Sequence, residues 1–286
     1  DLAKKMLPED REENGIRALI GIADDPEQQQ QHALELDFLS FHHLLLVGEA
    51  GSGKSTFLRT MLYSLAEQYG PDKLNYYILD LSGGAMNAMK ELPHCGAYLN
   101  DQSESDLNRL MNMLRGIIAE RKALFAEADV VNYNTYITIK PLPLILFVID
   151  SYTNIVNFET GAVFNTELHL FLREAASYGI CLAATMNHFG EMYSKAKMEM
   201  DYTIALWAKD RYDYTNILGT RTMLTAPQIQ GRGVCVIDGR SMEYHTAMPD
   251  AELEEVERTA NLHERLEELS RRYEGLPHAP GLPEKI

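Results

Sequence analysis

Gly48-Glu49-Ala50-Gly51-Ser52-Gly53-Lys54-Ser55, followed by Thr56, is the stretch that decides the fold of this 286-residue chain. It has the pattern G-x-x-x-x-G-K-[ST] of a phosphate-binding P-loop. The apolar segment before it, His43 to Val47, is typical of a buried strand. Apolar residues at helical spacing come after it: Phe57, Leu58, Met61, Leu62 and Leu65. Strand, glycine loop and helix therefore stand in the order that phosphate binding needs.

The glycine loop predicts a site for a nucleoside triphosphate, which we expect to be ATP. Glycines let backbone N–H groups turn inward around a phosphate, and the helix N-terminus adds the positive end of its dipole. We expect Lys54 to reach the β- and γ-phosphates and Ser55 to offer its hydroxyl to Mg²⁺. A glycine-rich turn that binds nothing is the alternative, and the flanking strand and helix disfavour it. The predicted ATP-contacting set is Gly48, Glu49, Ala50, Gly51, Ser52, Gly53, Lys54, Ser55, Thr56, Asp150 and Asn187.

A second motif, the Walker B pattern, is expected at the strand that ends in Asp150. Leu144 to Ile149 is an all-apolar run, as in a parallel strand buried on both faces, and Asp150 ends it. A carboxylate in this position holds Mg²⁺ directly or through water, so Ser55 and Asp150 are the predicted metal ligands. The next residue is Ser151, and a hydroxyl without a nearby base cannot take a proton at neutral pH. Glu159 lies too far along the chain to fill that place, so the sequence assigns no catalytic residue.

Two other strand ends are expected beside the nucleotide. Leu74 to Leu81 contains Asp80, which is better suited to capping the following turn than to orienting a catalytic loop. The strand from residue 179 to 185 is followed by Met186 and Asn187, and Asn187 is the predicted polar sensor of the γ-phosphate. His188 has two interpretations, a phosphate contact or an exposed loop histidine.

Composition limits the classes of partner. The formal net charge is −16, from 26 basic and 42 acidic side chains, and nucleic-acid binding normally needs a basic surface. No apolar run approaches the ~20 residues that cross a bilayer. The three cysteines match no metal-binding spacing and indicate reduced, buried thiols.

The order of elements predicts an α/β fold, a RecA-like P-loop NTPase domain with a mainly parallel central sheet and helices on both faces. We expect an edge hairpin from residues 16–22 and 32–38, and a second hairpin that turns at Asp238-Gly239. Long helices are expected at 106–128 and 251–273. The predicted organisation is an N-terminal linker at 1–15, an ATPase domain at 16–274 and an inter-module linker at 275–286.

The P-loop, the strand ending in Asp150 and the 179–185 strand resemble those of the FtsK/SpoIIIE translocase ATPases. Three further segments are similar to the EssC/EccC ATPases of type VII secretion: residues 21–28 with their Asp-Asp-Pro-Glu-Gln run, the Leu92-Pro93-His94 turn and the Gly231-Arg232-Gly233 turn. Those proteins are membrane-anchored chains with tandem ATPase modules. The resemblance covers about residues 16 to 250.

Departures from this family imply a degenerate module. Competent members carry Glu where this chain has Ser151, Gln where it has Met186 and, in many relatives, Arg where it has Ala176. The resemblance therefore implies a middle (second) module that binds ATP with weak or no hydrolysis, so that ATP has a structural or regulatory role. It implies neighbouring modules of the same chain, a ring-forming homo-oligomer and secreted protein substrates. It also implies a place at the cytoplasmic face of a bacterial membrane, without insertion by this segment.

Two alternatives stay open at this point. The first is an active translocase ATPase that moves protein or DNA, which needs a basic channel and a substitute base. The second is a small-molecule kinase, which needs an arginine-rich lid. Residues 186–232 offer only Arg211, Arg221 and Arg232 for such a lid.

Overall fold

The computed structural model describes residue 4 and residues 15–25, 28–219, 224–248 and 255–284. Within these ranges ten strands form one sheet in the order β2-β1-β10-β9-β8-β3-β7-β6-β4-β5. The strands are β1 (Arg17–Asp25), β2 (Gln30–Asp37), β3 (His43–Val47), β4 (Leu74–Asp80), β5 (Cys95–Asn100), β6 (Leu144–Asp150), β7 (Ile180–Met186), β8 (Tyr202–Leu206), β9 (Arg232–Ile237) and β10 (Arg240–Thr246).

The helices lie between and after the strands. The α-helices are α2 (Lys54–Gln68), α3 (Glu104–Glu127), α4 (Tyr133–Tyr136), α5 (Gly161–Ala175), α6 (Ser194–Lys197), α7 (Arg211–Leu218) and α8 (Glu255–Arg272). Three short 3₁₀ segments are η1 (Asn87–Glu91), η2 (Tyr152–Asn157) and η3 (Ala176–Tyr178). The first residues of the helix predicted at 251–273 lie outside the described residues.

The parallel half of the sheet positions the P-loop. β8, β3, β7, β6, β4 and β5 run parallel to one another. Every residue of β3, β4, β6 and β7 is buried, which is why these strands are apolar without alternation. Because the strands are parallel and adjacent, β3, β7 and β6 end at the same edge of the sheet, where ligands of open α/β sheets bind.

The other half of the sheet is antiparallel. β9 continues from β8, and β10, β1 and β2 follow with antiparallel pairing. The turn between β9 and β10 has positive φ at Asp238 and at Gly239, as a two-residue hairpin needs, so the predicted hairpin is confirmed. β2 is an edge strand paired with β1, which confirms the predicted edge hairpin.

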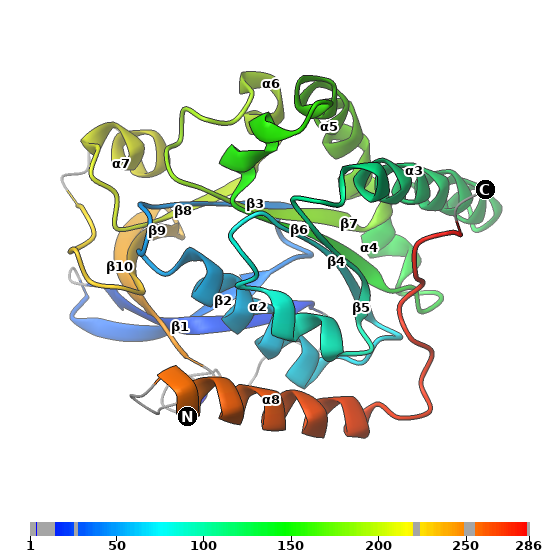
Figure 1. Ribbon diagram of the computed structural model, residues 1–286, viewed down its shortest axis with the longest axis horizontal. Helices are drawn as coiled ribbons and strands as arrows, with labels where there is room; N and C mark the ends of the chain where they lie inside the picture. Colours follow the sequence, from blue (N-terminus) through cyan, green and yellow to red (C-terminus); the bar gives the residue numbers. More distant parts are fainter. Residues whose placement is uncertain (1–3, 5–14, 26–27, 220–223, 249–254, 285–286) are drawn as a thin grey trace.

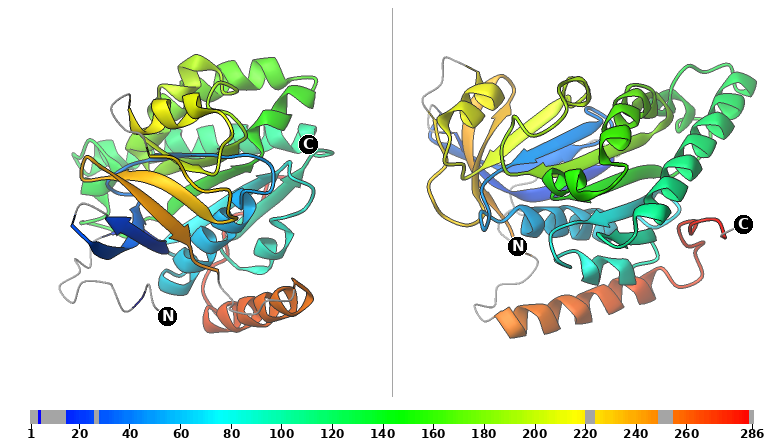
Figure 2. Two further views of the ribbon diagram at one scale, coloured as in Figure 1. Left: turned by 90° about the vertical axis from the view of Figure 1, so that its left-hand side faces the viewer. Right: turned by 45° about the horizontal axis from the view of Figure 1, so that its top comes forward.

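Helices cover both faces of the sheet (Figures 1 and 2). On one face, apolar residues of α2 and α8 pack against the strands in one cluster, and on the other face α3 and α5 form a second cluster. The predicted fold class is therefore confirmed: a large, mostly parallel sheet between two layers of helices. Among the described helices, none combines the length and the apolar character that crossing a membrane requires.

The segment after α8 packs along the edge strand β5. The backbone N–H of Ala279 donates to the Pro93 carbonyl at 2.8 Å, and the Tyr77 hydroxyl donates to the Pro280 carbonyl at 3.0 Å. In Figure 1 this segment, drawn in red, runs from α8 past β5 to α3. It covers an edge that would otherwise be free to pair with another chain. The linker and domain boundaries remain predictions, and residues 1–3, 5–14 and 285–286 of the two linkers lie outside the described residues.

Candidate nucleotide-binding site

The P-loop has the backbone that its glycines predict. It connects β3 to α2, and Gly51 and Gly53 have φ values of 77° and 108°, in the region that favours glycine. The first helical bond runs from the N–H of Phe57 to the carbonyl of Gly53 at 2.9 Å. No side chain caps α2, so the N–H groups of its first turn are left for a ligand.

Lys54, the first residue of α2, is held at the centre of the site. Its ammonium donates to the carbonyls of Gly48 at 2.5 Å and Glu49 at 2.9 Å, and to Asn187 Oδ1 at 3.1 Å. Burial lowers the pKa of Lys54. Three carboxylates oppose that shift, those of Asp150, Glu49 and Glu191. Lys54 thus bridges the P-loop and the corner after β7, and the site has more acidic than basic groups around its lysine.

Asp150 is buried at the end of β6 and held by two hydroxyls. Thr185 Oγ1 donates to its Oδ1 at 2.7 Å, and Ser82 Oγ donates to its Oδ2 at 2.7 Å. These bonds fix the orientation of the carboxylate at the same sheet edge as the P-loop. Ser55 lies in the first turn of α2, partly exposed.

These residues fit a triphosphate with Mg²⁺. The buried Ser52 Oγ has no hydrogen-bond partner, and a Cβ on Gly48 would lie 2.7 Å from it, so a side chain at residue 48 would close the loop. The described residues contain no group of three or more His, Cys, Asp or Glu able to hold a metal by themselves. Mg²⁺ in nucleotide sites is bound through few protein ligands together with phosphate oxygens and waters, and Ser55 and Asp150 would be those ligands here.

Ser151 follows Asp150 in a left-handed conformation with φ of 69°. Its N–H donates to Thr185 Oγ1 at 2.7 Å, and its hydroxyl accepts a bond from Asn154 Nδ2 at 3.1 Å. No carboxylate stands at this place. A non-glycine residue in this region of φ is strained, and such residues are often found at functional sites.

Glu191 is the site residue that the sequence analysis missed. Its Oε2 accepts from the N–H groups of Asn187 at 3.0 Å and His188 at 3.1 Å, and from the Thr153 hydroxyl. The carboxylate therefore ties the corner after β7 to the segment after β6, within electrostatic reach of Lys54. Its nearness in sequence to the predicted sensor Asn187 was the only signal available.

Other predicted residues have structural roles. Asp80 accepts bonds from the N–H and hydroxyl of Ser82 and from the Met86 N–H, all between 2.8 and 2.9 Å, so its predicted capping role is confirmed. The Met186 side chain is fully buried in β7 and has no polar group, while its carbonyl accepts from the Gly48 N–H at 3.1 Å. Glu159 lies beyond η2, and its N–H donates to the carboxylate of Glu104. It takes no part in the P-loop site.

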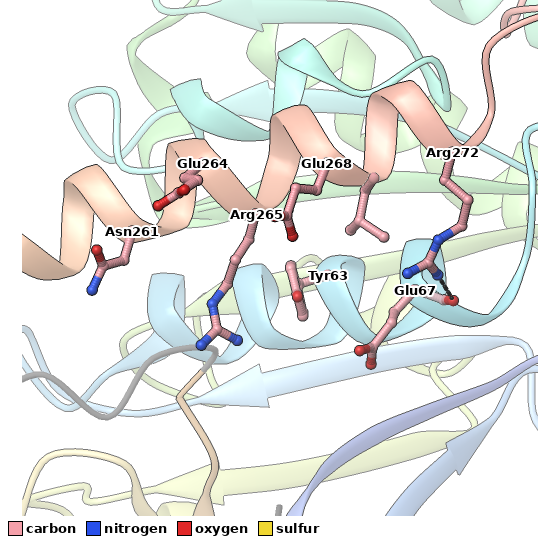
Figure 3. A pocket seen from close by; sticks show the side chains of 8 residues that line it. Tyr63, Glu67, Asn261, Glu264, Arg265, Glu268 and Arg272 are labelled. Atoms are coloured by element: carbon pink, nitrogen blue, oxygen red, sulfur yellow. Dashed lines mark hydrogen bonds between the residues drawn. The ribbon is translucent and has the colours of Figure 1, made fainter.

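A separate groove of about 470 Å³ lies between α2 and α8 and contains no P-loop residue (Figure 3). Side chains of both charges line it, including Glu67, Glu268, Arg265 and Arg272. The Arg272 guanidinium donates to the Glu67 carbonyl at 3.0 Å. Three glutamates and two arginines line the groove, and this mixed set of charges indicates contact between two helices rather than a nucleotide site.

The fold and the loop define a P-loop nucleotide-binding domain, and comparison with protein families gives its class. Residues 9–207 match the model of the FtsK/SpoIIIE family, and the chain belongs to that family.

Its relatives include type VII secretion proteins, as the sequence predicted. The chain is 26% identical over 266 residues to the ESX secretion system protein EccC of Geobacillus thermodenitrificans. It is 22% identical over 287 residues to the type VII secretion system protein EssC of Staphylococcus aureus. The matches cover 92% and 99% of this chain but only 18% and 19% of those proteins.

Solved structures confirm the fold. EssC (ATPases 2 and 3) from Geobacillus thermodenitrificans superimposes with a TM-score of 0.88 at 24% identity, over 98% of this chain and 53% of that one. EccC (ATPases 2 and 3) of Thermomonospora curvata, solved in complex with a signal sequence peptide, gives 0.79 at 21% identity, over 100% of this chain and 54% of that one.

Proposed function

We propose that this chain is an ATP-binding module of a type VII secretion motor, which binds ATP with Mg²⁺ and hydrolyses it weakly or not at all. One contrast carries the proposal. The P-loop is complete, with Lys54 bonded to Asn187 at 3.1 Å, whereas the residue after Asp150 is Ser151, whose hydroxyl is bonded to Asn154. A positioned general base contributes typically ~10²–10⁴-fold to a rate, so its loss leaves binding and removes most turnover.

Bound ATP then acts on stability and assembly. A ligand that binds only the folded state adds RT ln(1 + [L]/Kd), about 2.7 kcal/mol at ~100 times Kd. That is a large share of the net stability of a typical domain. It would hold the loops after β6 and β7 in one shape for a neighbouring module.

The partners of the whole protein are part of this proposal. We infer neighbouring ATPase modules of the same chain, a ring-forming homo-oligomer and secreted proteins as substrates, at the cytoplasmic face of the membrane. The names of the similar structures support tandem modules, and one of those proteins was solved with a signal sequence peptide. The net charge of −16 disfavours nucleic acid.

The test separates binding from turnover. Lys54→Ala removes charge-assisted contacts of roughly 1.5–3 kcal/mol each, so calorimetry should show at least tenfold weaker ATP binding. Lys73→Ala, at an exposed lysine in the turn after α2, is the matched control and should bind as the parent does. Equal binding by Lys54→Ala and the parent would refute the P-loop assignment. Phosphate release at ordinary motor rates, abolished by Lys54→Ala, would refute weak hydrolysis.

Interface stabilisation needs the full-length protein. Lys54→Ala in that chain should impair both secretion and association of the modules. If secretion fails while the modules associate normally and the domain melts at its usual temperature, the structural role of ATP is wrong.

An active translocase ATPase is the second candidate, and Glu191 is the observation that favours it. This carboxylate lies near Lys54, and its Oε1 is bonded to none of the described residues. Suppose that the parent hydrolyses ATP and that Glu191 supplies the general base. Glu191→Gln should then abolish hydrolysis without weakening ATP binding. Glu159→Gln, at an exposed carboxylate, is the control. Absence of turnover in the parent would reject this candidate.

A further inference from the structure

The corner after β7 carries a histidine that a buried carboxylate holds in place. His188 Nδ1 lies 3.3 Å from Asp213 Oδ2, and Asp213 belongs to α7. The other oxygen of Asp213 accepts from the Phe189 N–H at 2.7 Å. Only 3% of the Asp213 side chain is exposed, compared with 46% of the His188 side chain. A buried carboxylate is costly unless it is paired, so this pair is a built feature of the corner.

The ring is accessible on the side away from Asp213. Nε2 is bonded to no residue that the structure describes, whereas Nδ1 is occupied. The preceding residue is Asn187, which contacts the Lys54 ammonium at 3.1 Å. Glu191 Oε2 accepts from the N–H groups of both Asn187 and His188, and the carboxylates of Glu49 and Glu191 lie within electrostatic reach of both Lys54 and the His188 ring.

The excess of negative charge around Lys54 suggests a function for the His188 ring. The carboxylates of Asp150, Glu49 and Glu191 lie within electrostatic reach of Lys54, and a triphosphate adds more negative charge. A second cation beside the lysine would offset part of this excess. The hydrogen bond to Asp213 raises the pKa of His188, against the effect of burial, and the charges of Asp213, Glu191 and Glu49 add to that rise. The protonated form of the ring is thus stabilised relative to that of a free imidazole.

We propose that His188 is a second cationic contact for the terminal phosphate of bound ATP, and that Asp213 is the positioning residue that holds it there. The proposal rests on ATP binding at the P-loop. The proposal also connects α7 to the nucleotide site. A phosphate that attracts the His188 imidazolium also pulls on Asp213, which is hydrogen-bonded to that ring and belongs to α7. ADP lacks the γ-phosphate, so this link distinguishes the two nucleotides.

The test measures the Kd of ATP-Mg²⁺ and ADP-Mg²⁺ between pH 6 and 8.5 for the parent, His188→Gln and Asp213→Asn. The contact is complete below the ordinary pKa of 6.5 and is lost as the pH rises through the raised pKa. The parent should therefore lose roughly three- to tenfold in ATP affinity across that range, relative to His188→Gln. His188→Gln also reports the titration of ATP itself, which is subtracted. ADP affinity should change much less.

Asp213→Asn distinguishes positioning from a merely structural role. Asn can still accept from the Phe189 N–H, but it no longer stabilises the imidazolium, so the loss of ATP affinity should begin at lower pH than in the parent. An unshifted midpoint would remove Asp213 from the proposal. Equal ATP affinity and an equal pH profile for His188→Gln and the parent would refute the contact. If Lys54→Ala also binds ATP as tightly as the parent, the assignment of ATP to the P-loop is wrong. If Lys54→Ala loses ATP affinity but His188→Gln does not, only the proposed His188 contact is wrong.

Discussion

Thr185 offers the sharpest test of how the fold holds Asp150. It is fully buried in β7, and its hydroxyl makes two bonds, donating to Asp150 Oδ1 and accepting from the Ser151 N–H, both at 2.7 Å. Thr185→Val keeps the volume and removes both bonds. It leaves a buried carboxylate oxygen and a backbone N–H without this partner.

The magnitude follows from the two bonds. A hydrogen bond to a charged group contributes about 1.5–3 kcal/mol and a neutral one about 0.5–1.5 kcal/mol. Because Asp150 is only 1% exposed, water cannot replace the lost donor. We therefore expect Thr185→Val to lose about 2–4 kcal/mol of unfolding free energy. Thr185→Ser keeps the hydroxyl and deletes one buried methyl group, which costs about 1 kcal/mol.

Urea unfolding of the parent, Thr185→Ser and Thr185→Val measures the free energy of unfolding, which should decrease in that order. With ATP-Mg²⁺ present, Thr185→Val should also gain less stability from the ligand than Thr185→Ser does, because Asp150 is no longer oriented for the metal. The reasoning is wrong if Thr185→Val is as stable as the parent, or if Thr185→Ser loses as much as Thr185→Val.

Three further predictions concern pH and glycine. Burial lowers the pKa of His43 to about 4, so the unfolded chain takes up the proton first and stability should fall by up to about 3 kcal/mol as the pH drops from 6.5 toward 4. Denaturation of His43→Gln across that range should show a smaller fall; an equal fall would contradict the assignment. Gly53→Ala places a side chain at φ of 108°, which should cost about 1–2 kcal/mol and weaken ATP binding in calorimetry. Gly116→Ala, with no atom within 4 Å of the new Cβ inside α3, should instead raise the free energy of unfolding by about 0.5–1 kcal/mol and leave ATP binding unchanged; destabilisation would show that the helix is strained there.

The core strands and the P-loop could be predicted because their signals are local. An all-apolar run such as residues 144–149 indicates a strand buried on both faces without knowledge of its neighbours. The glycines at 51 and 53 predict a left-handed backbone because other residues rarely adopt it. Asp238-Gly239 likewise predicts its own hairpin.

The tertiary structure alone decided which residues each polar side chain contacts. Glu191, Asp213 and Thr185 carry no periodic signal, since one polar residue in a loop or strand end looks like many others. Their roles arise because the parallel pairing of β3, β7 and β6 brings strand ends from distant parts of the chain to one edge. The sequence by itself determined that a phosphate loop would form and that no carboxylate would follow Asp150. Only the folded sheet decided which hydroxyls orient Asp150 and which carboxylates surround Lys54, because hydrogen bonds and charges act over a few ångströms in space, whatever the separation along the chain.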